Sequence, residues 1–183
     1  MKKTILIFFA LTFCALSTIE AQKFFTRDGK VSFESDAPLE KIEAKNSNAT
    51  SVLDTESGKL EFAVLVKAFQ FEKALMQEHF NENYMDSDKF PKAVFKGKIE
   101  GFDFEKLNSK EKEFKIAGTM TIKGKSKAVE TIAKIKFVNN HIFAVSEFVV
   151  QPEDFGIKIP SIVRNKVAKD VKISFEYELV KKS

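Results

Sequence analysis

Hydrophobic and polar residues alternate along much of the chain, most regularly in the stretch FPKAVFKGKIEG at residues 90–101. Ala93, Phe95 and Ile99 fall on one side of this stretch, whereas lysine and glutamate side chains fall on the other. Because successive side chains of a β-strand point to opposite faces, the pattern predicts a strand with one apolar and one charged face. The charged face must meet water. The pattern leaves open whether the apolar face meets a packed interior or a bound molecule.

The same alternation recurs in six further segments, at residues 29–35, 59–69, 113–124, 129–137, 141–150 and 170–179. Residues typical of turns separate these segments, namely Asp28-Gly29, Ser57-Gly58, Gly124 and Asn139-Asn140. Most connections are short, which favours antiparallel neighbours. We therefore expect about seven to nine strands, almost all of them antiparallel.

One segment departs from this period. FEKALMQEHFNENYM, residues 71–85, contains no Gly or Pro and places Met76, Phe80 and Tyr84 at i, i+4 spacing, as it does Leu75 and His79. This spacing predicts a helix of about three to four turns, inserted between two strands and lying across one end or side of the sheet. The segment PSIVRNKV, residues 160–167, is a candidate for a second turn of helix.

Strands with one charged and one apolar face form either a sandwich or a closed barrel. Small residues among the large inward ones, such as Ala93, Gly97, Gly118 and Ala133, favour the barrel, because they permit coiling or leave space. Closure also removes the exposed edges of the sheet. The outward face carries Lys and Glu, which excludes a membrane barrel, since its outward face would be apolar. The pattern predicts a soluble barrel.

The N-terminus has the layout of an export signal. Lys2 and Lys3 precede the apolar run ILIFFALTFCAL, and the small residue Ala21 stands before Gln22. Residues 1–21 are therefore expected to form a cleaved signal peptide, and residues 22–183 one exported domain, periplasmic or secreted. A lipid anchor on Cys14 is the alternative, but the bulky Phe13 disfavours it. No other stretch approaches the ~18 apolar residues of a membrane span.

Composition narrows the function further. Without the signal peptide the net charge is +3 and evenly distributed, which excludes the basic stripe of a nucleic-acid-binding protein. Removal of Cys14, the only cysteine, excludes a disulfide or a thiolate site. The chain has 20 Phe, two Tyr and no Trp, a composition that suits a large apolar interior, either filled or hollow.

The residues that could carry catalysis or bind a metal form no recognisable site. His79 and Glu82 lie at i, i+3 on the predicted helix, without further ligands at a usable spacing. His141 is expected in a solvent-exposed hairpin turn. KGKSK at residues 123–127 reads as an anion site or as a simple turn, and the turn explains it as well. We therefore predict no catalytic residues, no metal and no cofactor.

Three short motifs follow one another along the chain: KFPKAVFKGKI, IAGTMTIKGKSKAV and VQPEDFGIKIP. Their order and content resemble the YceI-like family of exported bacterial proteins. That family has an aromatic-Pro step with a Phe after it, then Gly-x-Leu-Thr-Ile-x-Gly-x-x-Lys, then Asp-Phe-Gly. The matching residues here are Phe90-Pro91 with Phe95; Gly118, Thr121, Ile122, Gly124 and Lys127; and Asp154-Phe155-Gly156.

The resemblance covers the chain from about Gln22 onward. It implies an extended lipocalin-like barrel of eight antiparallel strands with a helix, whose interior holds a long isoprenoid or other lipid-like chain without catalysis. Met120 stands where the family usually has Leu, which keeps the position apolar. EHFNENYMDSD replaces the family's Asp-x-His-Leu segment, and His79 falls within a residue of the expected histidine.

Together these observations predict an all-β fold, an antiparallel lipocalin-like barrel of about eight strands with one inserted α-helix. The leading hypothesis is an exported, non-enzymatic carrier that binds a long polyisoprenoid or fatty-acid-like ligand. The alternative is an envelope-stress or interaction module with a filled barrel. A homodimer stays open. The candidate ligand-binding residues are Phe33, Phe62, Val64, Phe95, Ile99, Gly118, Met120, Ile122, Ile135, Ile173 and Phe175, with Gly97 and Gly118 expected to leave room for the ligand.

The signal sequence generates the first testable prediction. We expect cleavage between Ala21 and Gln22, because the small residue follows an apolar run of the right length. Intact-mass measurement of the exported protein should give a chain without residues 1–21. A diacylglyceryl mass on Cys14 would contradict the prediction and identify a lipoprotein.

Overall fold

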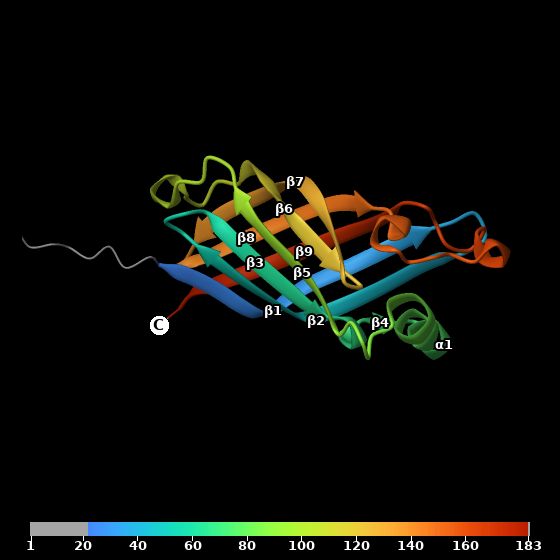
Figure 1. Ribbon diagram of the computed structural model, residues 1–183. Helices are drawn as coiled ribbons and strands as arrows, with labels where there is room; N and C mark the ends of the chain where they lie inside the picture. Colours follow the sequence, from blue (N-terminus) through green and yellow to red (C-terminus); the bar gives the residue numbers. More distant parts are fainter. Residues whose placement is uncertain (1–21, 183) are drawn as a thin grey trace, which may run out of the picture.

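The computed structural model describes residues 22–182, which form one barrel with a helix at its side (Figure 1). The predicted signal peptide lies outside the described residues. Nine strands are present, and they are β1 (Lys23–Asp36), β2 (Lys41–Asp54), β3 (Lys59–Leu65), β4 (Gln70–Phe71), β5 (Lys92–Ile99), β6 (Lys112–Ile122), β7 (Lys125–Val138), β8 (His141–Val150) and β9 (Val171–Lys181).

Eight of the strands close into a barrel. Their order is β1-β9-β8-β7-β6-β5-β3-β2, and pairing between β2 and β1 closes the circle. All pairings are antiparallel. β4 is a two-residue strand that pairs with β2 at Ala44 and Lys45, beyond the point where β3 ends. The structure thus confirms the predicted fold class.

The predicted helix begins later than expected but ends where expected. α1 (Ala74–His79) continues as a π-helix over η2 (Phe80–Met85), and Asp86 in the left-handed region ends it. The second predicted helical segment contains the short η5 (Ser161–Val163). The remaining helical turns are η1 (Val66–Ala68), η3 (Phe104–Lys106) and η4 (Pro152–Phe155). None of the helices in residues 22–182 is long and apolar enough to cross a membrane.

Two expectations about the strands were wrong. Asp28-Gly29 does not end a strand, because β1 runs through it with shifts of register against β2 between Thr26 and Val31. Gly29 is needed there because the ring of Tyr177 occupies the place of a side chain. The expected strand at residues 59–69 ends at Leu65, where η1 turns the chain away.

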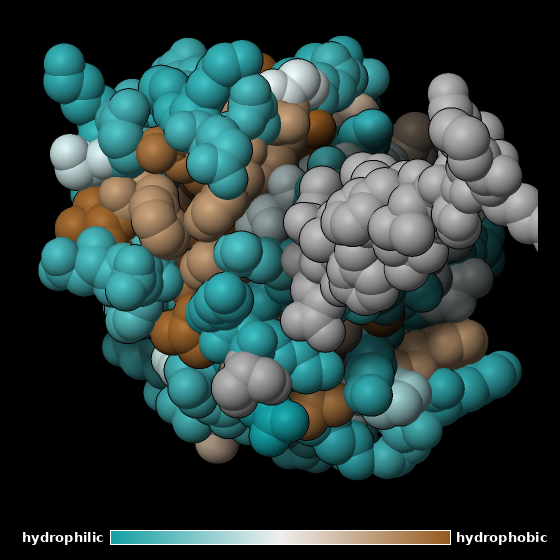
Figure 2. All heavy atoms as spheres, turned by 90° about the vertical axis from the view of Figure 1, so that its left-hand side faces the viewer, coloured by the Kyte–Doolittle hydropathy of each residue, from teal (hydrophilic) through white to brown (hydrophobic). Residues whose placement is uncertain are grey.

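Hydrophobic side chains fill the end of the barrel at which β1 begins. The rings of Phe24, Phe104 and Phe137 pack together, with centroids 5.2 to 6.1 Å apart. Phe24 is 1 % exposed, and Leu53, Leu107 and Leu179 are buried in the same core. On the surface at this end, hydrophilic residues surround an area of exposed hydrophobic side chains (Figure 2). This end is therefore closed by packing.

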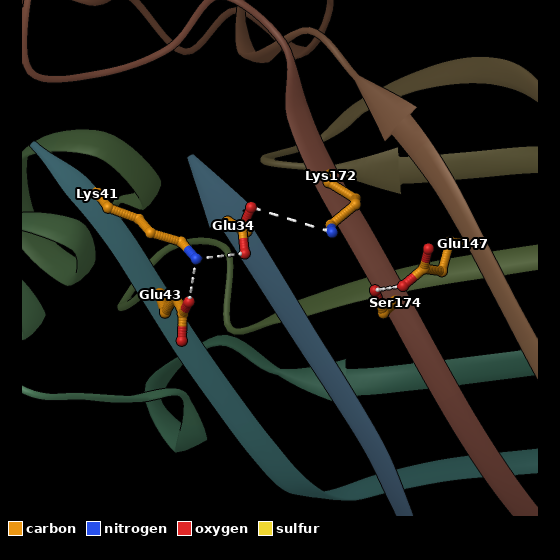
Figure 3. A network of polar contacts seen from close by, with 6 residues as sticks. All are labelled: Glu34, Lys41, Glu43, Glu147, Lys172 and Ser174. Carbon is orange, nitrogen blue, oxygen red and sulfur yellow. Dashed lines mark hydrogen bonds and ion pairs between the residues drawn. The ribbon is translucent and has the colours of Figure 1, made fainter. Parts of the chain in front are cut away.

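The outer face of the barrel is charged, as the alternation predicts. Lys41 on β2 contacts Glu43 at 2.8 Å and Glu34 on β1 at 3.1 Å (Figure 3). Ser174 on β9 donates a hydrogen bond of 2.9 Å to Glu147 on β8. These contacts link neighbouring strands across the surface, but solvent screening makes each of them a small contribution to stability.

Two inward glycines face each other across β5 and β6, but they leave no space for a ligand. Gly97 pairs with Gly118, and the ring of Phe95 lies over both. A Cβ atom would lie 2.5 Å from Phe95 Cε1 at Gly97 and 2.6 Å from Phe95 Cζ at Gly118. The room that the sequence predicted at these glycines is filled by this ring.

The close approach at Gly118 gives a stability prediction. Gly118→Ala should lower the free energy of unfolding by about 1–3 kcal/mol, because the methyl group overlaps Phe95 and the Lys96 carbonyl. Urea denaturation measures this change. The control Thr119→Val, on the exposed outer face of the same strand, should change stability by less than about 0.5 kcal/mol. A Gly118→Ala protein as stable as its parent would show that both the ring and the backbone of β5 shift to admit the methyl group.

Candidate functional site

The half of the barrel opposite the packed end contains a cavity of about 490 Å³. This volume lies within the range of about 300–1,000 Å³ that is typical of ligand-binding sites. Its wall combines the inner faces of the strands with α1, η2 and residues 150–171. Lys73, Leu75 and Lys166 line it and are also exposed, so the cavity opens to the surface between the helix and the 150–171 segment.

The helix closes the side of the cavity where the barrel wall is incomplete. Beyond Leu65 only the two-residue β4 pairs with β2, and the helix packs beside β4 with Met76, Phe80 and Tyr84 facing the cavity. The ring of Phe80 stacks on Phe33 at 5.3 Å and lies 5.0 Å from the ring of Phe71. Of the two i, i+4 series in the sequence, Met76, Phe80 and Tyr84 are half-buried, whereas Leu75 and His79 are exposed at the mouth.

Aromatic rings form the floor of the cavity. Phe62 stacks on Phe95 at 4.7 Å and contacts Phe175 at 5.6 Å. Phe62 and Phe175 line the cavity, whereas Phe95 lies below them and is 2 % exposed. These rings separate the open half of the barrel from the packed half.

The structure brings most of the predicted ligand-binding residues together. The cavity wall includes seven of them, namely Phe33, Phe62, Val64, Met120, Ile122, Ile173 and Phe175. Four others face inward but do not line the cavity. Phe95 lies under the floor, Ile99 and Ile135 are buried in the packed half, and Gly118 lies beneath the ring of Phe95. Alternation shows the side on which a residue lies, but not its depth along the barrel. Contact with a ligand stays a prediction for the seven.

The sequence did not identify the cavity residues of the segment between β8 and β9. They include Phe155, Ile157, Ile159 and Val163, which cover the cavity from this side. The hydroxyl of Ser35 on β1 accepts a hydrogen bond of 2.8 Å from the Ala168 N–H and holds the segment to the barrel. The signal that could have found them is the apolar alternation of Ile157 and Ile159 after Asp154-Phe155-Gly156.

The three sequence motifs meet at the turn between β6 and β7. The ring of Phe90 covers Gly124, and the aliphatic part of Lys125 covers Gly156. Lys127 contacts Asp154 at 3.3 Å. The motifs therefore hold the mouth of the cavity together, and their glycines are needed where side chains from another motif pack on the backbone.

The lysines of KGKSK connect this turn to the segments on either side of it. Lys123 and Gly124 have positive φ angles of 49° and 73°, as a tight two-residue turn requires. The Lys123 ammonium donates a hydrogen bond of 2.7 Å to the Tyr84 carbonyl of η2. The turn thereby contacts the helix on one side and the 150–171 segment, through Lys127, on the other.

Polar groups at the cavity are few and lie at its mouth. Glu40 and Lys73 pair there at 3.3 Å, and the exposed His79 and Lys166 also line the mouth. His141 is not in the turn but begins β8, where its Nδ1 lies 2.5 Å from Glu178 Oε1. Within residues 22–182, no three His, Cys, Asp or Glu side chains are grouped so that they could hold a metal ion.

A tyrosine hydroxyl is buried beneath the cavity floor. Tyr177 is 3 % exposed, and its ring contacts those of Phe62 at 5.8 Å and Phe175 at 5.3 Å. Its hydroxyl has no hydrogen-bond partner among the described residues. Burial raises the pKa of the Tyr177 phenol above its ordinary value of 10.0, because an apolar surrounding disfavours the phenolate.

Comparison with known proteins identifies the family. Residues 17–179 match the YceI-like domain family. The match extends over most of the 183 residues, so the chain belongs to this family. No match was found among curated protein sequences.

Several solved structures share the fold. A polyisoprenoid binding domain from Saccharophagus degradans is 10 % identical, with a TM-score of 0.75, and the similarity covers 88 % of this chain and 99 % of that one. BcnA from Burkholderia cenocepacia is 16 % identical, with a TM-score of 0.68 and coverage of 83 % and 96 %. The YCEI protein of Campylobacter jejuni is 18 % identical, with a TM-score of 0.57 and coverage of 100 % and 99 %. At these identities the likeness shows the fold alone.

The buried hydroxyl gives a second stability prediction. Tyr177→Phe should raise the free energy of unfolding by about 1 kcal/mol, because it removes a buried polar group without a protein partner. The raised pKa also means that the stability of the parent is fully present below pH 10.0 and decreases as the pH rises above it. Urea denaturation at neutral pH and above pH 10.0 should show this decrease in the parent and less of it in Tyr177→Phe. A less stable Tyr177→Phe protein would show that the hydroxyl is hydrogen-bonded in solution.

Proposed function

We propose that this member of the YceI-like family is an exported, non-enzymatic carrier that binds one long hydrophobic molecule, of polyisoprenoid or similar lipid-like chemistry. The observation that supports this most directly is the cavity of about 490 Å³. Its wall is built almost entirely from hydrocarbon side chains, and its polar groups lie at the mouth. Such a wall recognises a ligand by shape and by exclusion of water.

Burial of hydrocarbon alone supplies enough free energy for such a role. Each buried methylene contributes about 0.8 kcal/mol, so ten buried carbons contribute roughly 8 kcal/mol before the ligand's ordering cost is subtracted. A free energy of about 8 kcal/mol corresponds to roughly micromolar affinity. A carrier function therefore requires no polar motif deep in the barrel.

The related structures support the same class of ligand. The domain from Saccharophagus degradans is described as polyisoprenoid binding, and its fold covers 88 % of this chain. A long, flexible isoprenoid suits the aromatic wall around Phe33 and Phe80, since rings offer large apolar surfaces.

The arrangement of polar groups favours binding over catalysis. His79, the histidine nearest the cavity, is exposed at the mouth, where Glu40 is paired with Lys73. The deeper wall offers a chain-like ligand hydrocarbon rather than an acid, a base or a nucleophile. We therefore assign no catalytic step to the protein.

The signal-like N-terminus supports a role outside the cytoplasm, periplasmic or secreted, where a carrier would move a water-insoluble molecule between membranes or proteins. The alternative, an interaction module with a merely structural barrel, requires a filled interior. The packed half fits that requirement, but the open half does not.

A ligand trapped during purification tests the proposal. Native mass spectrometry of the protein from its own host should show an added mass that dissociates on activation, and lipid extraction should identify a hydrophobic chain. Ala93→Leu should lower the occupied fraction at least about fivefold, because the larger side chain enters the cavity next to Val64 and Ile122.

Ala117→Leu is the matched control. It makes the same change on the outer face of β6, opposite Lys98 and Glu130, and should leave occupancy unchanged. Circular dichroism checks that both variants are folded. Absence of any bound hydrophobic species, together with failure to bind added geranylgeraniol, would reject the carrier function.

A further inference from the structure

Large hydrophobic side chains are exposed around the mouth of the cavity. Leu39, Leu75 and Ile162 are 69 %, 60 % and 89 % exposed, and they belong to the β1–β2 turn, to α1 and to η5. The Leu39 N–H donates a hydrogen bond of 3.0 Å to the carbonyl of Asn165, and Glu40 pairs with Lys73 at 3.3 Å. These contacts place the three segments side by side around the mouth.

The segment at residues 156–169, here named the basic rim, is also strongly cationic. It contains four basic residues and no Asp or Glu, and the basic residues are Lys158, Arg164, Lys166 and Lys169. None of the four forms an ion pair with another residue of the described chain. At the opposite end of the barrel, residues 98–115 instead mix five lysines with five acidic residues.

We propose that the basic rim docks the protein on the surface of an anionic phospholipid bilayer, with Ile162 inserted into the interface. An exposed isoleucine next to unpaired cations is the combination that binds such interfaces, because the side chain leaves water while the cations meet lipid phosphates. Val163 and Lys166, on the same segment, line the cavity. Docking therefore places the cavity mouth against the bilayer.

Charge also sets the orientation. Residues 72–88, which include α1 and η2, carry five acidic residues and only one lysine, so this side of the mouth is repelled by an anionic surface. The β1–β2 turn, which carries Glu40 and follows Asp36, is acidic as well, so the basic rim alone approaches the bilayer first, and the turn and the helix lie farther from it. A lipid can then pass between bilayer and cavity with little exposure to water.

This inference goes beyond the proposed function, because vesicle binding is measured without reference to what the cavity holds. The purified protein is mixed with vesicles of phosphatidylcholine alone or of equal parts phosphatidylcholine and phosphatidylglycerol, and the bound fraction is measured by sedimentation. We expect binding to the anionic vesicles, weaker binding at high salt, and little binding to phosphatidylcholine alone.

Two variants test the two parts of the rim. Ile162→Ser should weaken binding to the anionic vesicles about fivefold, because it removes the inserted side chain. The triple variant Lys158→Gln, Arg164→Gln, Lys169→Gln should weaken it about a hundredfold, at about fivefold for each charge. All four side chains are exposed, so the variants should fold as the parent does.

Each variant has a matched control at a distance from the mouth. Ile132→Ser removes an exposed isoleucine from the outer wall of β7, and Lys59→Gln, Lys98→Gln, Lys110→Gln removes three exposed charges near the packed end. Both controls should keep most of the parent's vesicle binding.

Three outcomes would overturn the proposal. Equal losses in test and control variants would show that only net charge matters. Failure of the parent to bind anionic vesicles at low salt would also overturn it, even if geranylgeraniol still binds in the cavity. Self-association through Ile162 in light scattering, without vesicle binding, would identify a protein interface instead.

Discussion

The cavity depends on the packing of Phe80 against the inner wall of the barrel. β3 ends at Leu65, and beyond it only the two-residue β4 pairs with β2, so a gap remains in the wall, which the helix that carries Phe80 covers. An open gap would expose the aromatic cluster of Phe33, Phe69 and Phe71 to water, so covering it stabilises the helix and the wall together. None of the residues of α1 is buried, so the contacts that η2 makes with the barrel through Phe80 hold the helix in place.

The interior is divided between a packed half and a cavity. The packed half, around Phe24 and Phe137, supplies the buried hydrophobic area that holds a barrel without disulfides. The rings of Phe62 and Phe95 form the boundary. The family motifs lie at the other end and brace the mouth, which explains why residues such as Gly124 and Gly156 occur in them although they do not line the cavity.

The alternation of residues predicted the barrel because a charged outer face and an apolar inner face are opposite sides of the same strands. The alternation did not predict β2, because the inward positions of this strand include Ala44, Asn46 and Ser51, which are small or polar. Asn46 is buried, and its side-chain amide donates a hydrogen bond of 3.0 Å to the carbonyl of Leu65, a contact between distant segments that no local pattern shows. For the same reason, the sequence identified inward residues such as Ile135 but not their depth, which depends on the register between strands.

The turn between β6 and β7 joins the two flanks of the mouth. Lys123 holds the helix on one side of the mouth, and Lys127 holds the 150–171 segment on the other. An outward movement of either flank would break a contact to this turn, so the turn links the two flanks, although the exposed pair of Lys127 and Asp154 contributes little energy. If the cavity holds a ligand, as proposed, the hydrocarbon wall would set how favourable its burial is, and loosening of the contacts at this turn would be part of its path out.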